Sequence, residues 1–515
     1  MIPFSIGPIE RIISRYDAAV AARDGFRSVM QDCYRYAIPD RDLWTDFAPG
    51  QRKGSELYDS TAIVAVQDFA SSLQARICPS WRTWSKLVAG PGLPKDVREN
   101  DELAMYLEET TDQLFGYINH SNFALKSHEA FQDLSVGTGA ITLELNERGN
   151  GLSFDSIPAP HLAIEEGPNG MVETVFQDRK SAVSVLARTY PGISLPEKWQ
   201  KMLVDKPGEL VSYQVGSIFD PKRREYHLVV FCKAEKQPMY YRLYGETSPV
   251  IVFRWTTNPG EIWGRGPVMR ALPDIKTLNK VVEFILRDAA MSISPPITAV
   301  TDGVVNPYTL VLQPNAVIPV MSNDTSNPSL RELTRSSRPD LAQFILAEMR
   351  QSVRNMMFSD PRRREGPVQS ATEVLIEDRE FTQRIGSSYG RLQTEFVERV
   401  LNRSVALLKS IGKMPDFKID GREITLKHLS PLARAQDQEE LLGLQTAVAM
   451  AAPFGPEALQ MAVKTEDIGE WIFKKAGVDA SVLRSDAERK QMMQTVAQQA
   501  QAAIAAQTGQ APAAA

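Results

Sequence analysis

Residues 260–280 read GEIWGRGPVMRALPDIKTLNK, with three glycines in seven positions directly before a run that has helical spacing. A dinucleotide-binding loop would need a third glycine where Met269 stands, after the G-x-G of Gly264 and Gly266. Pro267 lacks the N–H group that a phosphate-binding loop would donate. We therefore predict a tight turn that leads into a helix. In it Gly264 and Gly266 are free to take positive φ, and Pro267 stands near the helix start.

The helix after this turn, expected over 268–293, carries an apolar seam. Its residues recur at alternating spacings of three and four, at Ile275, Leu278, Val282, Ile285 and Ala289. Such spacing offers one face to a neighbouring helix. The segment 297–337 holds four prolines and short β-like runs, which indicates a small excursion from the core. Pro339 then opens a second helix that reaches about residue 358.

A loop over 359–370 precedes a long helix. Ser370 and Glu373 form an S-x-x-E capping box, and apolar spacing continues from there to about residue 411. At 1.5 Å per residue this helix would be roughly 60 Å long, which is the length of a rod that crosses an assembly. Short helices are expected over 412–500, and 501–515 is an Ala/Gln-rich tail without predicted order.

The first half of the chain alternates between helical and strand patterns. Helices are predicted over 9–37, from Asp59 or Ser60 to Ile77, over about 96–118, over 123–135 and over 180–205. Antiparallel hairpins are predicted over 140–178 and further strands over 210–257. The fold class is therefore α+β and mainly helical.

Composition limits the possible classes of protein. A length of 515 residues allows two to four compact units, and no stretch approaches the roughly 20 apolar residues of a membrane-spanning helix. The N-terminus shows no export signal, and three scattered cysteines indicate buried thiols from a reducing compartment. A net charge of −5 argues against a protein that wraps DNA with a basic surface.

The motifs of catalysis and metal binding are missing from the sequence. It contains no P-loop, no G-x-S-x-G elbow, and no histidine or cysteine pairs at zinc spacing. We therefore assign no catalytic, cofactor-binding or metal-ligating residue. Glu165 and Glu166 are expected to flank a solvated hairpin turn. Trp81 and Trp84 are expected to anchor a loop on the core.

Arg362, Arg363 and Arg364 form the one basic cluster that stands out. They could contact phosphates, or they could belong to a solvated loop whose charges pair with carboxylates such as Asp360 and Glu365. The sequence leaves both interpretations open.

Four stretches together resemble the portal, or head-to-tail connector, proteins of short-tailed bacteriophages. They are YDSTAIVAVQDFASSLQARICPSWRTWSKL, SNFALKSHEAFQDLSVGTGAITLEL, WGRGPVMRALPDIKTLNK and SDPRRREGPVQSATEV. Each motif is weak alone, but they are specific in combination, and the likeness covers about residues 9–500. It implies an α/β wing over 1–265, a first stem helix over 266–296, a clip over 297–337, a second stem helix over 338–358, a tunnel loop over 359–370, a long wing-to-crown helix over 371–411, a helical crown or barrel over 412–500 and a disordered tail over 501–515.

The resemblance also implies a function and partners. Portal proteins form a ring, typically a dodecamer, at one capsid vertex of the virion, and double-stranded DNA passes through the ring without sequence-specific contacts. The implied partners are the terminase large subunit, a tail adaptor, and the major capsid and scaffolding proteins, with assembly in the host cytoplasm. Arg362–Arg364 would lie in the tunnel loop, and Gly264, Gly266 and Pro267 at the wing–stem junction.

Two alternatives remain at this stage. A nucleotide-dependent enzyme could use the loop 260–267, although the missing third glycine counts against it. A nucleic-acid-binding scaffold that does not close into a ring is the other, and the acidic composition counts against that.

Overall fold

The structure is a computed structural model of the whole chain. The residues that it describes are 7–45, 50–51, 53–54, 56–80, 82–98, 100–293, 297–299, 320–322, 324, 326, 330–332, 339–359, 384–386, 388–415, 424–428, 441, 443–450, 472, 492 and 495. The chain divides into two compact units. Unit 1 comprises Met1–Phe26, Ala70–Arg265 and Arg363–Ala515, and unit 2 comprises Arg27–Phe69 and Gly266–Arg362.

Unit 1 contains a five-stranded antiparallel sheet in the order β4-β5-β6-β7-β8. Its strands are β4 (Leu162–Glu166), β5 (Val172–Ala182), β6 (Leu210–Asp220), β7 (Glu225–Cys232) and β8 (Gln237–Gly245). Each strand pairs with the next one along the chain. The sheet is therefore a meander built from local connections.

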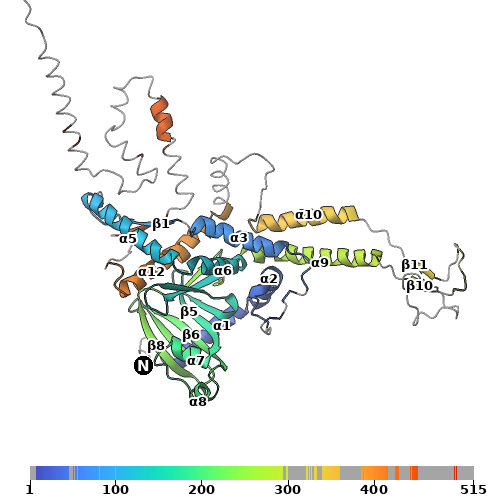
Figure 1. Cartoon of the computed structure of the whole chain (residues 1–515), viewed down its shortest axis with the longest axis horizontal. Coiled ribbons are helices and arrows are strands. Elements are labelled where there is room, and N and C mark those ends of the chain that lie inside the picture. The colour runs from blue at the N-terminus through green and yellow to red at the C-terminus, as the bar shows by residue number, and fades with distance from the viewer. Residues whose placement is uncertain are drawn as a thin grey trace, which may run out of the picture. The chain divides into compact units, whose positions relative to one another are not determined.

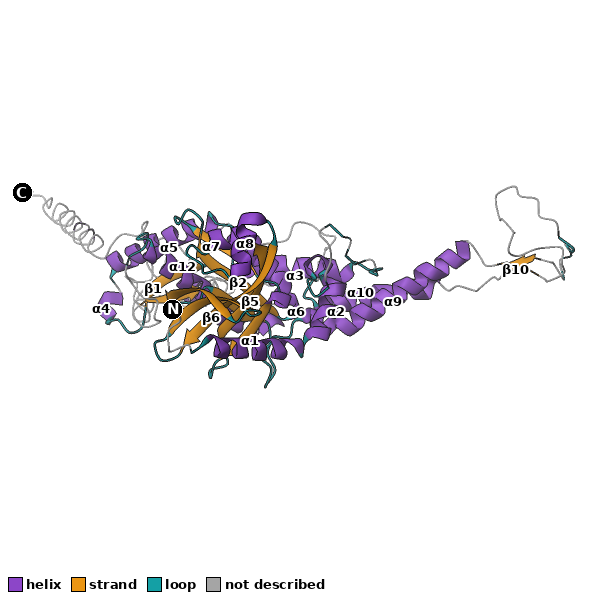
Figure 2. Ribbon diagram, turned by 90° about the horizontal axis from the view of Figure 1, so that it is seen from below, coloured by secondary structure: helices purple, strands orange, loops and turns teal. Residues whose placement is uncertain are grey.

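Helices cover both faces of this sheet. Alternation along β7 sends Leu228, Val230 and Cys232 into one apolar cluster, and Val229 and Phe231 into another. The first cluster packs under α7 and α8 and the second under α1, so the sheet lies between helices (Figure 2). These helices are α1 (Ile9–Asp24), α7 (Val183–Thr189) and α8 (Glu197–Asp205). A strand that is buried on both faces needs an unbroken apolar run, which β7 has.

A second sheet of unit 1 has the order β3-β2-β9. Its strands are β2 (Thr138–Leu145), β3 (Leu152–Ser156) and β9 (Val250–Arg254). The β2–β3 and β4–β5 pairs are antiparallel, so the predicted hairpins are confirmed. The pairing of β2 with β9 joins the two predicted strand regions in one sheet.

An aromatic cluster fills the core beside this sheet. The Phe396 ring centroid lies 4.7 Å from that of Phe253, 5.2 Å from Phe131 and 6.3 Å from Phe123. Trp84 is buried and packs on Phe123, so its predicted role as an anchor is confirmed. Trp81 lies outside the described residues.

The remaining elements of unit 1 are helices and one short strand pair. The helices are α4 (Lys95–Arg98), α5 (Asp101–Asn119), α6 (Phe123–Val136), the 3-10 turn η2 (Ala159–His161), the π-helical turn η3 (Gln393–Val397) and α12 (Glu398–Ser410). Strands β1 (Ser85–Ala89) and β12 (Ile424–His428) pair antiparallel across more than three hundred residues of sequence.

Unit 2 is built around helices. Its elements are α2 (Arg27–Ala37), the 3-10 turn η1 (Pro39–Arg41), α9 (Pro267–Ile293), α10 (Pro339–Met356), β10 (Ile297–Ala299) and β11 (Leu330–Glu332). Helix α3 (Thr61–Ile77) runs across the boundary between the two units. Strand β10 follows α9 and strand β11 precedes α10 in the sequence, and the two strands pair antiparallel.

The predicted mainly helical α+β class is confirmed, but three predicted helices are wrong in detail. The helix expected over 9–37 breaks at Gly25 and Phe26 into α1 and α2. The helix expected over 180–205 is two short helices, because 180–182 belong to β5 and Pro191 and Pro196 interrupt the rest.

The third helix, expected over about 96–118, divides into α4 and α5. Asn100 caps α5 by accepting a 2.8 Å hydrogen bond from the Glu102 amide. Of the helices that the structure describes, none has both the length and the apolar character needed to cross a bilayer.

Candidate functional site

The turn that leads into α9 depends on a close approach between two backbone segments of unit 1. A Cβ atom on Gly264 would lie 2.1 Å from the carbonyl oxygen of Gly137, so only glycine fits there. The Gly264 amide donates to Thr138 Oγ1 at 3.0 Å, and the Arg265 amide donates to the Thr256 carbonyl at 2.7 Å. The loop therefore binds protein groups where a phosphate-binding loop would present free amides.

The expectation of positive φ at Gly264 and Gly266 is wrong. Neither Gly264 nor Gly266 lies in the left-handed region. Gly264 is required because its backbone lies close to Gly137, the residue between α6 and β2, and Pro267 is the first residue of α9. The adjoining Trp263 is fully buried, which fixes the loop on the core of unit 1.

Helices α9 and α10 lie side by side and run antiparallel (Figure 1). Ser352, near the end of α10, donates to Asp274, near the start of α9, at 3.4 Å. Helix α10 is thus a neighbour for α9, as the apolar seam of α9 predicted. Of the seam residues, Ile275, Leu278 and Val282 are buried.

Loop 56–59 joins the middle of α9 through Asn279. The Asn279 Oδ1 atom accepts hydrogen bonds from the amides of Tyr58 (2.7 Å) and Asp59 (3.2 Å), and its Nδ2 donates to the Glu56 carbonyl at 3.0 Å. This buried amide therefore satisfies three backbone groups that would otherwise be unpaired.

Asp59 connects the same loop to α10. It accepts from the Thr61 amide at 2.8 Å, at the start of α3, and from Arg350 at 2.8 and 2.9 Å. Burial alone would raise the pKa of Asp59, but the hydrogen bonds from Thr61 and Arg350 outweigh it and hold the pKa below its ordinary value. Asp59 is thus the residue that caps α3, one of the two predicted candidates.

Four basic side chains of the helix pair have carboxylate partners in unit 2. The pairs are Lys276 with Asp32, Lys280 and Arg287 with Glu283, and Arg350 with Asp59. A cation that is already paired attracts DNA phosphate less than a free one does. These four cations therefore contribute little free positive charge to the surface of the pair.

The far end of the helix pair exposes large apolar side chains. They lie in the second half of α9 and the first half of α10, which the antiparallel arrangement places at the same end: Phe284, Leu286, Met291, Ile293, Phe344 and Ile345. Ile293 is 85% exposed and Phe344 is 68% exposed. Large apolar residues left exposed at one end of a helix pair indicate an interaction surface. We call this set the apolar end.

The predicted arginine cluster Arg362, Arg363 and Arg364 lies outside the described residues, as does the tail 501–515. Helix α10 ends at Met356, Phe358 has a left-handed φ of 56°, and Ser359 is the last described residue before the cluster. The Ser359 amide donates to the Arg354 carbonyl at 2.9 Å, which closes the end of the helix.

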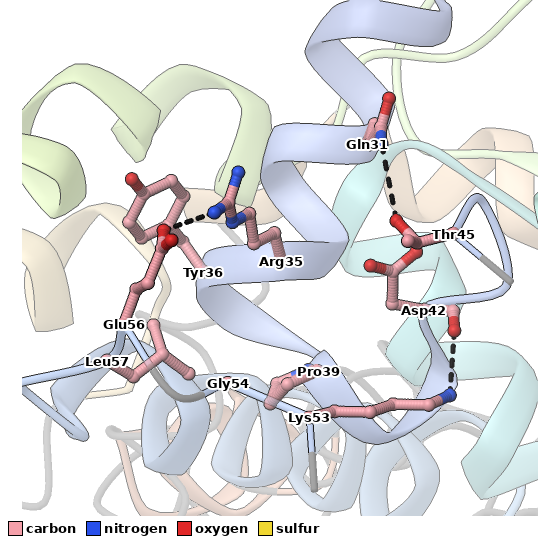
Figure 3. A pocket seen from close by; sticks show the side chains of 10 residues that line it. All are labelled: Gln31, Arg35, Tyr36, Pro39, Asp42, Thr45, Lys53, Gly54, Glu56 and Leu57. Carbon is pink, nitrogen blue, oxygen red and sulfur yellow. Dashed lines mark hydrogen bonds and ion pairs between the residues drawn. The ribbon is translucent and has the colours of Figure 1, made fainter. Parts of the chain in front are cut away.

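A cavity of about 420 Å³ lies beside α2 in unit 2 (Figure 3). Arg35, which lines it, pairs with Glu56, and the Lys53 amine donates to the Asp42 carbonyl at 2.7 Å. These charged groups already bind protein atoms, so the cavity does not resemble a prepared acid–base site. Within the described ranges, no group of three or more His, Cys, Asp or Glu side chains could hold a metal ion.

Comparison with known proteins shows the family. The family described as bacteriophage head to tail connecting protein matches residues 10–483. The chain belongs to this family. The family expected from the sequence is therefore confirmed.

Several relatives of this connector family align along most of the chain. The portal protein of Salmonella phage epsilon15 is 22% identical, covering 98% of this chain and 94% of the relative. The portal protein of Escherichia phage T7 is also 22% identical, covering 94% and 90%. One solved structure, from the virion of a native gene transfer agent particle, is 12% identical with a TM-score of 0.33, covering 76% of this chain and 86% of that chain.

One residue that sequence inspection missed is Arg254, at the end of β9 in unit 1. It is fully buried, and it forms ion pairs with Glu166 at 3.1 Å and Glu395 at 2.7 Å. The available signal was an arginine inside the apolar run VIVFRW, because a buried charge needs a partner. Glu166 is therefore ion-paired where a solvated turn was expected, and Glu165 likewise pairs with Arg15.

Proposed function

We propose that copies of this chain assemble into a closed ring, a dodecamer, that forms the portal at one capsid vertex. Double-stranded DNA would pass through the ring during packaging and ejection. The family match over residues 10–483 supports this proposal, together with portal relatives that align along nearly the whole chain.

The apolar end of the α9–α10 pair is the structural observation that carries the proposal. Exposed apolar side chains cost about 25 cal/mol for each Å² left in water, so Phe284, Ile293 and Phe344 favour association with another molecule. Side-by-side copies around an axis would cover all of these ends in the same way, as cyclic symmetry requires. The parts implied by the resemblance then follow, with 266–296 and 338–358 as the stem and 297–337 as the clip.

A conduit must let DNA slide. Each DNA phosphate that a protein cation neutralises adds about 0.9 to the exponent with which the binding constant falls as salt rises. A channel wall with many free cations would therefore bind the duplex tightly and keep it from sliding. The net charge of −5 and the carboxylate partners of Lys276, Lys280 and Arg350 favour a weakly binding wall. Arg362–Arg364, in the proposed tunnel loop, would form one ring of positive charge around the channel. This ring would contact the DNA phosphates and make no base-specific contacts.

The proposed partners follow from this role. The ring would dock the terminase large subunit and a tail adaptor in turn, and would join the major capsid and scaffolding proteins during assembly in the host cytoplasm. The subunit itself would act as a structural conduit without catalysis. We expect calorimetry with ATP to show no binding, because the 260–267 loop bonds its own strands.

Mass photometry and electron-microscopy class averages of the purified chain test ring formation. We expect closed annuli. The double variant Phe284→Glu, Phe344→Glu should give unassembled subunits with an unchanged circular dichroism spectrum. The control is Val204→Glu, at an apolar position of unit 1 that is more exposed than either phenylalanine. A wild-type chain that stays monomeric at every concentration would refute the proposal, as would annuli that survive the double variant.

The arginine cluster is tested separately. Replacing Arg362, Arg363 and Arg364 with alanine should leave ring assembly intact but impair DNA packaging or retention. Normal packaging by the triple variant would rule out a DNA contact at this cluster.

A further inference from the structure

A second cavity, of about 670 Å³, opens on the surface of unit 1. Three stretches that lie far apart in the sequence form its walls: the last turns of α5 with the residues that follow them, the turn between β2 and β3, and the residues directly after α12. Its volume lies within the range of cavities that hold organic ligands. The cavity is formed entirely by residues of unit 1.

The wall after α12 carries Lys413. Gly412 has a left-handed φ of 68°, its amide donates to the Lys409 carbonyl at 3.0 Å, and the Lys413 amide donates to the Leu408 carbonyl at 2.9 Å. These two hydrogen bonds form a Schellman motif, which fixes the backbone at a helix end. Among the residues that the structure describes, the Lys413 side chain has no hydrogen-bond or ion-pair partner. Its ammonium is therefore an unpaired cation on a fixed backbone.

The wall between β2 and β3 is held by its own side chains. Asn146 Oδ1 accepts from the amides of Asn150 at 3.0 Å and Gly151 at 3.3 Å, and Asn146 Nδ2 donates to Asn150 Oδ1 at 2.9 Å. Asn122, just before α6, then joins β3 by donating to the Phe154 carbonyl and accepting from the Phe154 amide, both at 2.8 Å. The wall is thus formed before a ligand arrives, which lowers the entropy cost of binding.

The wall on α5 contains a glycine that the fold does not require. Gln113, Gly116 and Tyr117 lie on one face of the helix. A Cβ atom on Gly116 would meet no atom within 4 Å, and the φ of Gly116 is not positive. Glycine inside a helix is less stable than alanine. Neither packing nor backbone conformation explains this glycine, whereas the missing side chain leaves space in the cavity.

The lining of the cavity consists mainly of hydrogen-bond donors and one positive charge. Lys413 contributes the ammonium, Gln113 and Asn150 contribute amide N–H groups, and Tyr117 contributes a hydroxyl. None of the lining residues is Asp or Glu. Such a set of groups favours an anion with several acceptor oxygens. The Tyr117 ring and the buried Leu152 add apolar surface beside these groups.

We propose that this cavity binds a carboxylate on an acidic peptide segment of a partner protein. The Lys413 ammonium pairs with the carboxylate, and Tyr117 and Leu152 contact an adjoining apolar side chain. A small inorganic anion would leave most of the 670 Å³ unfilled. Gln113, His120 and Asn150 are exposed at the cavity mouth, so the rest of the peptide has a way out to solvent.

The biological meaning of the cavity rests on the proposed function. In a portal, the acidic segment would belong to a protein that joins the ring. Peptide binding is measured on the purified full-length chain, whether or not that chain forms rings. A failure to bind is therefore distinguishable from a failure to assemble.

Saturation-transfer NMR of the dipeptide N-acetyl-Leu-Glu, observed on the dipeptide, tests the cavity with the full-length protein. We expect a dissociation constant of about 1 mM or below, and at least about tenfold weaker binding of the uncharged diamide. The two monoamides show whether the side-chain or the terminal carboxylate is recognised. Lys413→Gln should weaken binding at least about tenfold, because it removes the charge-assisted partner. The matched control is Lys409→Gln, the same change one turn earlier and outside the cavity lining.

A second variant guards against loss of the fold. Gly116→Leu replaces a poor helix former with a good one and fills open space, so it should weaken binding at least about tenfold while the thermal midpoint stays equal or rises. Unchanged binding by Gly116→Leu would overturn the proposal. So would diamide binding as strong as that of the dipeptide, equal losses in Lys413→Gln and Lys409→Gln, or no saturation transfer at about 10 mM dipeptide.

Discussion

The five-stranded sheet of unit 1 and the α9–α10 pair of unit 2 bury their apolar side chains to different extents. Strand β7 sends Val229 and Val230 into opposite clusters, and helices close both. The helix pair is buried along the first half of α9, as far as Glu283, whereas Ile293 and Phe344 at its other end remain in water. The sheet is complete within one chain. We propose that a second molecule completes the helix pair, and the following predictions test that difference.

The largest effect is expected in the core of unit 1. Phe396→Ala removes the ring that contacts Phe123, Phe131 and Phe253, and should lower the free energy of unfolding by about 3–5 kcal/mol. Urea denaturation followed by near-ultraviolet circular dichroism measures it. Phe344→Ala, at the apolar end, is the control and should change subunit stability by less than about 0.5 kcal/mol. Equal losses in the two variants would remove the contrast between the units.

A smaller, pH-dependent effect is expected at Asp59 in unit 2. Its folded-state pKa is lowered, so the stability it contributes is present above about pH 4, where the carboxyl of the unfolded chain is ionised. That stability is lost as the pH falls through the lower folded-state pKa. Asp59→Asn should therefore cost about 1–3 kcal/mol at pH 7 and much less at pH 2.5. Denaturation curves at the two pH values check this, and a pH-independent cost would contradict the assigned role.

The smallest effect is expected at an exposed ion pair of unit 1. Arg188 and Glu147 lie 3.1 Å apart with both side chains largely in water. Arg188→Ala should change the free energy of unfolding by less than about 0.5 kcal/mol. A loss above 2 kcal/mol in thermal denaturation would show that surface charges, and not burial, dominate the stability of unit 1.

Elements with a local sequence pattern were predicted well. Features that depend on contacts between residues far apart in the sequence were missed. The seam of α9 and the hairpins of unit 1 were visible because apolar spacing and turn residues lie close together in sequence. The break between α1 and α2 was hidden because Phe26, Met30 and Cys33 continue the helical spacing across it. That break coincides with the boundary between the units.

Long-range pairing and close packing account for the other misses. Strands β1 and β12 were not predicted, since nothing near Ser85 indicates a partner near His428. Gly264 was recognised as a turn residue, but its cause is the carbonyl of Gly137, which only the folded chain brings near. Arg254 was overlooked for the same reason, because Glu395 is its partner across 141 positions.

The most direct test of the central claim compares the accessibility of two matched positions in the assembled protein. Ile293, at the apolar end, and Val204, on unit 1, are 85% and 82% exposed in the single chain. The three native cysteines are buried, and burial raises the pKa of Cys33 to about 12, so they give little background reaction with a thiol reagent.

Single variants Ile293→Cys and Val204→Cys would be labelled with maleimide under native conditions. If neighbouring copies cover the apolar end, Cys at position 204 reacts rapidly while Cys at position 293 reacts at least about 100-fold more slowly, and denaturant removes the difference. Equal rapid labelling at both positions in the native protein would show that the apolar end stays in water, and would contradict the account.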